Sequence, residues 1–162
     1  MRKIVTFLWF NDQAKEAVDL YVSLFENVKI INTSYLTESV AKEAGLKPGA
    51  VSSIDFELNG QNFTALNGGP MYTLSEATSI AVNCKDQEEI DKLWEALSKG
   101  GKIMSCGWLT DKYGLTWQIM PESLDIMMRD PDTAKADRVS AAMLSMEGKL
   151  NLSELEKAYK GE

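Results

Sequence analysis

One order of predicted elements, a strand followed by a helix and then three strands, occurs twice along the 162-residue chain. This repeat constrains the fold more than any other feature of the sequence. The first copy covers roughly residues 1–67 and the second residues 78–120. Because strands and helices do not alternate regularly within a copy, the repeat favours a mixed α+β sheet over a doubly wound parallel sheet.

The first copy contains the clearest local pattern. Ile54, Phe56 and Leu58 alternate with polar residues and lead to Asn59-Gly60, after which a second strand runs to Leu66. Asn-Gly between two such strands predicts a tight hairpin. The other predicted elements of this copy are a strand at 3–10, a helix capped by Asn11 or Asp12, a strand at 28–35 and a loop with room for one helical turn at 36–50.

The second copy follows the segment Asn67-Gly68-Gly69-Pro70, whose residues favour a turn and interrupt the strand pattern. Its helix is predicted from four apolar residues that recur at helical spacing, Ile90, Leu93, Trp94 and Leu97. The predicted elements are a strand at 78–84, that helix at 86–98, short strands at 102–105 and 107–111, a turn at 112–114 and a strand at 115–120.

The chain after Pro121 is predicted to be helical. A helix at 134–147 carries an apolar stripe, and Asn151 with Glu154 forms a capping box for a final helix through Tyr159. A Met-rich stripe outside the repeat needs a surface to cover. That surface is either the chain's own sheet or a partner chain, and both stay open. The stripe consists of Ala136, Val139, Ala142, Met143 and Met146.

Charge and hydropathy exclude several classes of partner. The net charge is -7 and the 17 basic residues form no long cluster, so nucleic acid would be repelled over most of the surface. No apolar run reaches the roughly 18 residues of a membrane span. The apolar N-terminal stretch stops at Asn11 and predicts a strand, not a signal peptide. We therefore expect a cytoplasmic protein in which Cys84 and Cys106 are free thiols.

The sequence contains no histidine. This absence excludes an imidazole general base, a histidine-containing triad and a His-ligated metal within one chain.

Several separate segments match a known family in order. They include FELNGQNFTALNGGP, SIAVNC, CGWLTDKYGLTWQIMP and the terminal RV..AML.M and L..AY patterns. The chain thereby resembles the PhnB-like family, some members of which are labelled demethylubiquinone methyltransferase. The resemblance implies the vicinal-oxygen-chelate fold of the glyoxalase and bleomycin-resistance superfamily, usually a homodimer. It predicts one domain at 1–162, with two β-α-β-β-β modules, about 1–70 and 77–121, in an open curved mixed sheet around a cavity, and C-terminal helices at about 122–160.

Metal-using members of that superfamily typically bind the ion through two His and two Glu residues. The resemblance places the corresponding positions here near Thr6, Ser79 and Gln118, with the remaining one at 65–67. Hydroxyls and carboxamides are weak ligands for a transition ion. We therefore expect no bound zinc, iron, nickel or manganese, and we identify no other cofactor.

The same positions are candidates for a ligand site. Thr6, Ser79 and Gln118 could orient a small molecule in an apolar pocket, or they could only satisfy one another or bound water. Trp9 and Trp108 could line the cavity or fill a core. If Gln118 faces the cavity, strand alternation sends Trp117 beneath the helices with Leu115 and Ile119.

No catalytic residue is identified. Asp55 and Glu57 share one face of a strand and could suggest acid–base catalysis. We expect instead that they are exposed surface residues on an edge strand, which is the commoner case. Both cysteines are expected to be structural. The sequence thus favours a metal-independent small-molecule-binding protein of unknown ligand over a metal-independent enzyme on a small organic substrate. A methyltransferase has the least support, because no glycine-rich strand-to-helix loop is present.

Overall fold

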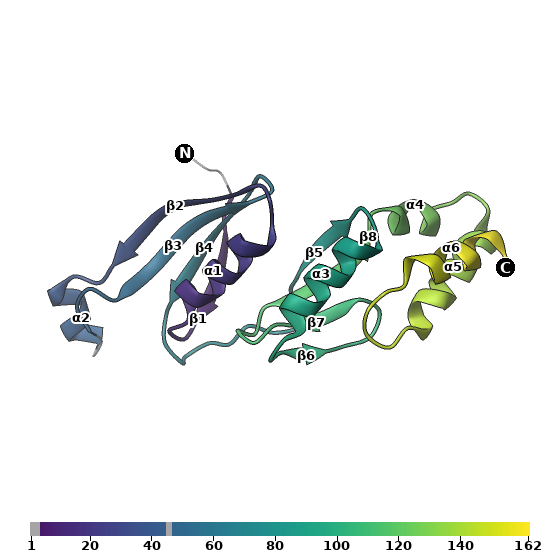
Figure 1. The fold of residues 1–162 in the computed structure, drawn as a ribbon. Coiled ribbons are helices and arrows are strands. Elements are labelled where there is room, and N and C mark those ends of the chain that lie inside the picture. Colours follow the sequence, from purple (N-terminus) through teal and green to yellow (C-terminus); the bar gives the residue numbers. More distant parts are fainter. Residues whose placement is uncertain (1–3, 45–46) are drawn as a thin grey trace. The chain divides into compact units, whose positions relative to one another are not determined.

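The computed structural model describes residues 4–44 and 47–162. The chain divides into two compact units, Met1–Leu74 and Ser75–Glu162. Each unit contains a four-stranded mixed sheet with helices (Figure 1), so the α+β prediction is confirmed. Strand pairing joins the strands into two separate four-stranded sheets and not into one.

In unit one the strand order is β1-β4-β3-β2, with β1 parallel to β4 and the other pairs antiparallel. Helix α1 contacts β3 and β4 and lies along one face of this sheet (Figure 1). The elements are β1 (Thr6–Phe10), α1 (Ala14–Leu24), β2 (Val28–Tyr35), α2 (Glu38–Ala44), β3 (Val51–Leu58) and β4 (Gln61–Asn67).

The core of unit one lies between α1 and its sheet. Alternate residues of β1, β3 and β4 point toward the helix, and the Phe56 and Phe63 rings stack there at 5.3 Å between centroids. The predicted hairpin between them is confirmed, because Asn59 and Gly60 have φ values of 46° and 83°. The other buried side chains of this core include Leu8, Phe10, Ala17, Val18, Tyr21, Ile54 and Ala65.

Two predictions for unit one are wrong. The segment predicted as a loop contains α2, a helix of 7 residues and not a single turn. Helix α1 begins at Ala14 with Gln13 as its N-cap, and the Gln13 side chain makes no capping hydrogen bond. Instead, Asn67 Oδ1 accepts a hydrogen bond from Ala14 N at 2.8 Å, while Asn67 Nδ2 donates to Val51 O at 3.0 Å. A residue from β4 therefore caps the helix in place of Asn11 or Asp12.

Unit two repeats the arrangement with the order β5-β8-β7-β6. Here β5 is parallel to β8, and α3 contacts β5, β7 and β8 from one side (Figure 1). The elements are β5 (Ser79–Cys84), α3 (Gln87–Ser98), β6 (Lys102–Ile103), β7 (Trp108–Thr110), β8 (Thr116–Pro121), α4 (Ser123–Met128), α5 (Thr133–Ser145) and α6 (Leu152–Lys160).

The turn between β7 and β8 is built around Asp111, which is 3% exposed. Its Oδ1 accepts the backbone N–H groups of Tyr113 and Leu115, at 2.8 and 3.1 Å, and its Oδ2 accepts the Trp117 indole N–H at 2.9 Å. Trp117 is 1% exposed and packs on the α3 side of the sheet, as predicted. Strands β6 and β7 are shorter than predicted, because Cys106 and Gly107 turn the chain with φ values of 60° and 81°.

The C-terminal helices pack on one another within unit two. Val139 of α5 is fully buried with Leu155 of α6 and Leu124 of α4, and Met143 and Met146 pack against this cluster. Part of the Met-rich stripe thus packs within its own chain, against the neighbouring helices and Met120 of β8. Asn151 caps α6 as predicted, because its Oδ1 accepts Glu154 N at 3.1 Å.

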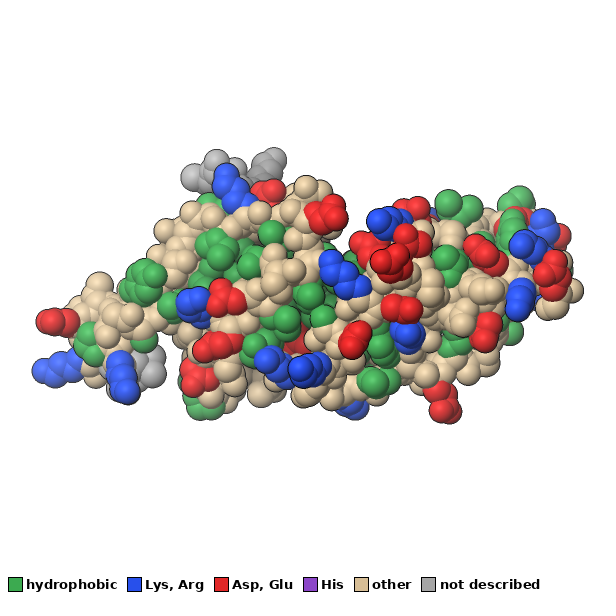
Figure 2. All heavy atoms as spheres, viewed as in Figure 1, with side chains coloured by type: hydrophobic (Ala, Val, Ile, Leu, Met, Phe, Trp, Pro, Cys, Tyr) green, Lys and Arg blue, Asp and Glu red, His purple; other side chains and the backbone are tan. Residues whose placement is uncertain are grey.

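Acidic side chains gather over α3 in the space-filling view (Figure 2), where the helix carries Glu88, Glu89, Asp91 and Glu95. Such a surface is unfavourable for a phosphate backbone. Within residues 4–44 and 47–162, no helix has both the length and the apolar character that crossing a membrane requires.

We expect Asn67→Ala to lower the free energy of unfolding by about 2 kcal/mol, because two hydrogen bonds are lost and the first turn of α1 loses its cap. Urea denaturation followed by circular dichroism measures the change. Asn11→Ala is the control, since Asn11 is exposed and its side chain was the cap predicted from sequence. Equal effects of the two substitutions would contradict the tertiary cap.

Candidate functional site

Each sheet has one face covered by its helix and one face that its helix does not cover. The helix-free face of the sheet in unit two is built from alternate residues of three strands, and register pairs Gln118 with Ala81 on one side and Trp108 on the other. We call this surface the unit-two face. It consists of Ser79, Ala81, Trp108, Thr110, Thr116 and Gln118.

The unit-two face combines polar groups with one indole. Gln118 Nε2 donates to Ser79 Oγ at 2.6 Å, and both side chains are half-buried. The Thr110 and Thr116 hydroxyl oxygens lie 3.4 Å apart. A hydroxyl can donate one hydrogen bond and accept two, and a carboxamide has two N–H donors and a carbonyl acceptor, so the Ser79–Gln118 pair keeps capacity to bind a ligand.

Three of the five residues selected from the sequence thus lie together. Ser79, Gln118 and Trp108 come from β5, β8 and β7 and occupy one surface. Sequence reasoning missed Thr110 and Thr116, although both follow from alternation once Gln118 is assigned to this face.

The other two selected residues belong to unit one and lie on opposite faces of its sheet. Thr6 shares the face of Leu8 and Phe10, which α1 covers, and it pairs with the buried Phe63. Trp9 points to the helix-free side, where its indole N–H donates to Gly69 O at 2.9 Å. The structure therefore does not bring Thr6 and Trp9 together.

Trp9 packs against the loop that follows β4. A side chain on Gly68 would come within 2.2 Å of the indole ring, and the Tyr72 ring meets Trp9 edge-on at 5.0 Å. This loop, with Leu36, Ser52 and Leu66, lines an open pocket of about 630 Å³ within unit one. The pocket's Asn67 amide is already engaged by Ala14 and Val51.

The paired acids of β3 do not fit the exposed edge that the sequence suggested. Strand β3 lies between β4 and β2, and Asp55 and Glu57 are half-buried. Thr64 Oγ1 donates to Asp55 Oδ1 at 2.6 Å across the β3–β4 pair. This contact gives Asp55 a structural partner on the helix-free face of unit one.

The two cysteines differ in environment. Cys84 is fully buried, and this burial, with smaller effects of Glu89 and Asp86, raises the pKa of its thiol to about 12. Its thiolate is therefore scarce at neutral pH, which fits the structural role expected for it. Cys106 is half-buried at the corner before β7.

The candidate metal positions carry neutral side chains in different surroundings. Thr6 lies on the helix-covered face, and Ser79 and Gln118 are bonded to each other on the unit-two face. In the part of the chain that the structure describes, no group of three or more His, Cys, Asp or Glu side chains is arranged to hold an ion. This neutral donor set does not fit a transition metal.

The strand-to-helix turns before α1 and α3 are the places where a nucleotide-type cofactor would bind in a glycine-rich loop. The turn from β1 to α1 is Asn11-Asp12-Gln13, and the turn from β5 to α3 is Lys85-Asp86. Neither contains glycine, and Asp86 Oδ1 already accepts Glu89 N at 2.9 Å. A carboxylate that occupies the helix N-terminus competes with any anionic ligand group there.

Comparison with known proteins gives one family. The family model described as 3-demethylubiquinone-9 3-methyltransferase matches residues 2–120. The match ends before the terminal helices, which the sequence resemblance had included. No curated protein matches the chain.

Two solved structures resemble about three quarters of this chain. The PhnB protein from Bacillus cereus is 35% identical, with a TM-score of 0.66 over 74% of this chain and 99% of its own. Protein PA1353 from Pseudomonas aeruginosa is 19% identical, with a TM-score of 0.57 over 75% of this chain and 98% of its own. The second likeness shows the fold alone.

Proposed function

Because the chain belongs to the 3-demethylubiquinone-9 3-methyltransferase family, to which the PhnB-like resemblance pointed, we propose that it binds a small organic ligand on the unit-two face without a metal ion. One observation carries the proposal. Ser79, Trp108 and Gln118, from three different strands, adjoin on a face that α3 leaves uncovered. An apolar ring beside a few fixed polar groups is the usual composition of a small-molecule site.

The chemistry of the face favours a planar ring with oxygen substituents. The Trp108 indole offers a stacking surface, while the Ser79 hydroxyl and the Gln118 carboxamide can exchange hydrogen bonds with carbonyl or phenol oxygens. The family's name suggests a quinone of the ubiquinone type as the first compound to test. Binding is preferred to catalysis, because the six residues of the face carry no ionisable side chain, and Lys102, which pairs with Thr110 at the edge of the face, is exposed and bonded to Glu76.

Methyl transfer is not proposed. S-adenosylmethionine is the usual methyl donor for such a reaction, and the acidic, glycine-free turns before α1 and α3 do not fit it. A metal-independent enzyme on a small organic substrate remains the second candidate, and it would use the same face.

We expect 2,3-dimethoxy-5-methyl-1,4-benzoquinone, the ubiquinone ring without its tail, to quench the fluorescence of Trp108. Gln118→Ala should weaken binding about tenfold, since a ligand hydrogen bond of roughly 1.4 kcal/mol is lost. Fluorescence titration of the full-length protein measures both effects. The Trp108→Phe variant separates specific quenching from that of the other tryptophans.

Gln61→Ala is the matched control for that titration, because Gln61 is an exposed carboxamide on the hairpin of unit one. S-adenosylmethionine, titrated in parallel by calorimetry, should show no binding. If no quinone, phenol or related ring compound gives quenching that depends on both Trp108 and Gln118, the proposed site is wrong.

Metal independence is a separate expectation, motivated by the neutral side chains at the candidate metal positions. Protein purified without a histidine tag should contain well under one transition-metal ion per chain by elemental analysis. Chelators should leave its melting temperature and ligand titration unchanged. A stoichiometric ion that survives dialysis and raises the melting temperature would overturn this expectation.

We further propose a homodimer, as the family resemblance implies, and a cytoplasmic location, as expected from the N-terminal strand and the free thiols. Met143 and Met146 of the stripe pack against the helix cluster of their own chain, so we place the contact on the helix-free side of unit one, where Phe7 is 65% exposed. Light scattering at micromolar concentration should show a dimer that Phe7→Ser weakens. Leu144→Ser, at an exposed position of α5, is the control. A monomeric full-length protein, or a dimer weakened only by Leu144→Ser, would contradict this assignment.

A further inference from the structure

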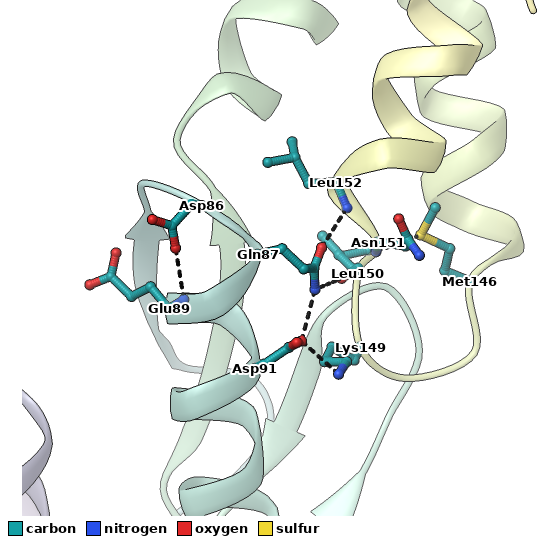
Figure 3. Close-up of polar contacts among 9 residues, drawn as sticks. All are labelled: Asp86, Gln87, Glu89, Asp91, Met146, Lys149, Leu150, Asn151 and Leu152. Carbon is teal, nitrogen blue, oxygen red and sulfur yellow. Dashed lines mark hydrogen bonds and ion pairs between the residues drawn. The ribbon is translucent and has the colours of Figure 1, made fainter.

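The Gln87 side chain of α3 holds the segment before α6 by two hydrogen bonds. Gln87, the first residue of α3, donates from Nε2 to Leu150 O at 3.2 Å and accepts Leu152 N on Oε1 at 2.8 Å. Figure 3 shows this amide reaching from the helix to the backbone of the C-terminal segment. The amide therefore pairs with one donor and one acceptor of the segment, as the backbone of a neighbouring strand would.

A second polar contact lies beside the first. Lys149 Nζ is 2.6 Å from Asp91 Oδ1, and Gln87 Nε2 also donates to that carboxylate at 2.9 Å (Figure 3). The hydrogen bond from Lys149, followed by that from Gln87, lowers the pKa of Asp91. Because the charged pair is about half exposed, solvent screens it, and Gln87 is the more important link.

The same segment holds the corner that leads into β7. Cys106 N donates to Met146 O at 3.0 Å, and Gly107 N donates to Gly148 O at 2.8 Å. A side chain on Gly107 would come within 3.0 Å of Leu150 Cγ and within 2.7 Å of Ile119 O. We call residues 146–152 the strap. It therefore lies directly against the residue that precedes Trp108.

The C-terminal helices also border the other side of the unit-two face. Strand alternation places Met120 on the same side of β8 as Gln118. Met120 packs against the cluster of α4, α5 and α6. Both Trp108 and Gln118 thus neighbour residues that contact the C-terminal part of the chain.

We propose that the strap, docked by Gln87, sets the position of β7 and of the Trp108 side chain, so that Gln87 is a positioning residue for the unit-two face. The family match ends at Met120, so Gln87 and β7 lie within the matched residues and the strap lies beyond them. Its consequence for ligand binding rests on the proposed function, whereas the positioning itself does not.

Amide hydrogen exchange on full-length Gln87→Ala tests the positioning. We expect exchange at Trp108–Thr110 to become about tenfold faster or more, because local opening of β7 no longer has to work against the docked strap. Exchange in β5 should stay unchanged. Lys92→Ala, at an exposed position of the same helix, is the control and should change neither segment.

Two results would overturn the proposal. In the first, exchange rises in residues 146–160 while Trp108–Thr110 stay protected, which would make Gln87 an anchor of the tail alone. In the second, every segment exchanges faster by the same factor, which would indicate general destabilisation. Gln87→Glu keeps the acceptor for Leu152 N and should fall between the wild type and Gln87→Ala, and an effect as large as that of alanine would also contradict the proposal.

The quinone titration separates this inference from the proposed function. If the wild type binds the quinone, Gln87→Ala should raise its dissociation constant several-fold, and an unchanged constant would contradict positioning of the ligand face. If the wild type does not bind it, the proposed ligand chemistry fails, while the exchange measurement still decides whether the strap positions β7.

Discussion

A single helix can cover only one face of a four-stranded sheet, and this limit leaves the opposite face of each sheet uncovered by its helix. In each unit, α1 or α3 buries alternate side chains of the strands that it contacts, such as Phe56 and Phe63 in unit one and Leu109 and Trp117 in unit two. The side chains between them must face the other way. That opposite side can be partly polar without cost to the core, provided that its polar groups find partners.

Those partners come from neighbouring strands. Thr64 donates to Asp55 in unit one, and Gln118 donates to Ser79 in unit two. Both bonds lie on the side that the helix leaves uncovered, where half-buried polar groups would otherwise be only partly hydrated. The unit-two pair spans parallel strands 39 residues apart in sequence. It therefore stabilises the sheet in the absence of a ligand, and a ligand would have to bond to it without losing that contact.

Register is fixed at the β7–β8 turn, and the character of the unit-two face depends on it. Asp111 is almost completely buried, which is costly for a carboxylate unless donors surround it. Two backbone N–H groups and the Trp117 indole supply them. Because Trp117 is held inward, Gln118 must point outward. A slip of one residue would exchange the two side chains and place an indole where the carboxamide now lies.

Local contacts could be predicted from the sequence, and distant ones could not. The Asn59-Gly60 hairpin, the Asn151 cap and the alternation of Trp117 with Gln118 all depend on residues a few positions apart. Asn67 caps a helix 53 residues earlier in the chain, and Gln87 reaches a backbone 63 residues later. No local propensity reveals such partners. Thr6 differs, because its two-residue spacing from Leu8 was visible in the sequence and already assigned it to the helix side.

The corner at Cys106-Gly107 explains why the C-terminal chain is coupled to the sheet. Both residues have positive φ, so the backbone turns its N–H groups away from the sheet ladder and toward the strap, where Met146 and Gly148 accept them. Only a residue without a side chain permits Leu150 to approach this closely at Gly107. Without the strap, two donors at the start of β7 would have to bond to water, and the buried Leu150 side chain would be exposed. The position of Trp108 is therefore energetically linked to helices that lie outside the repeated modules.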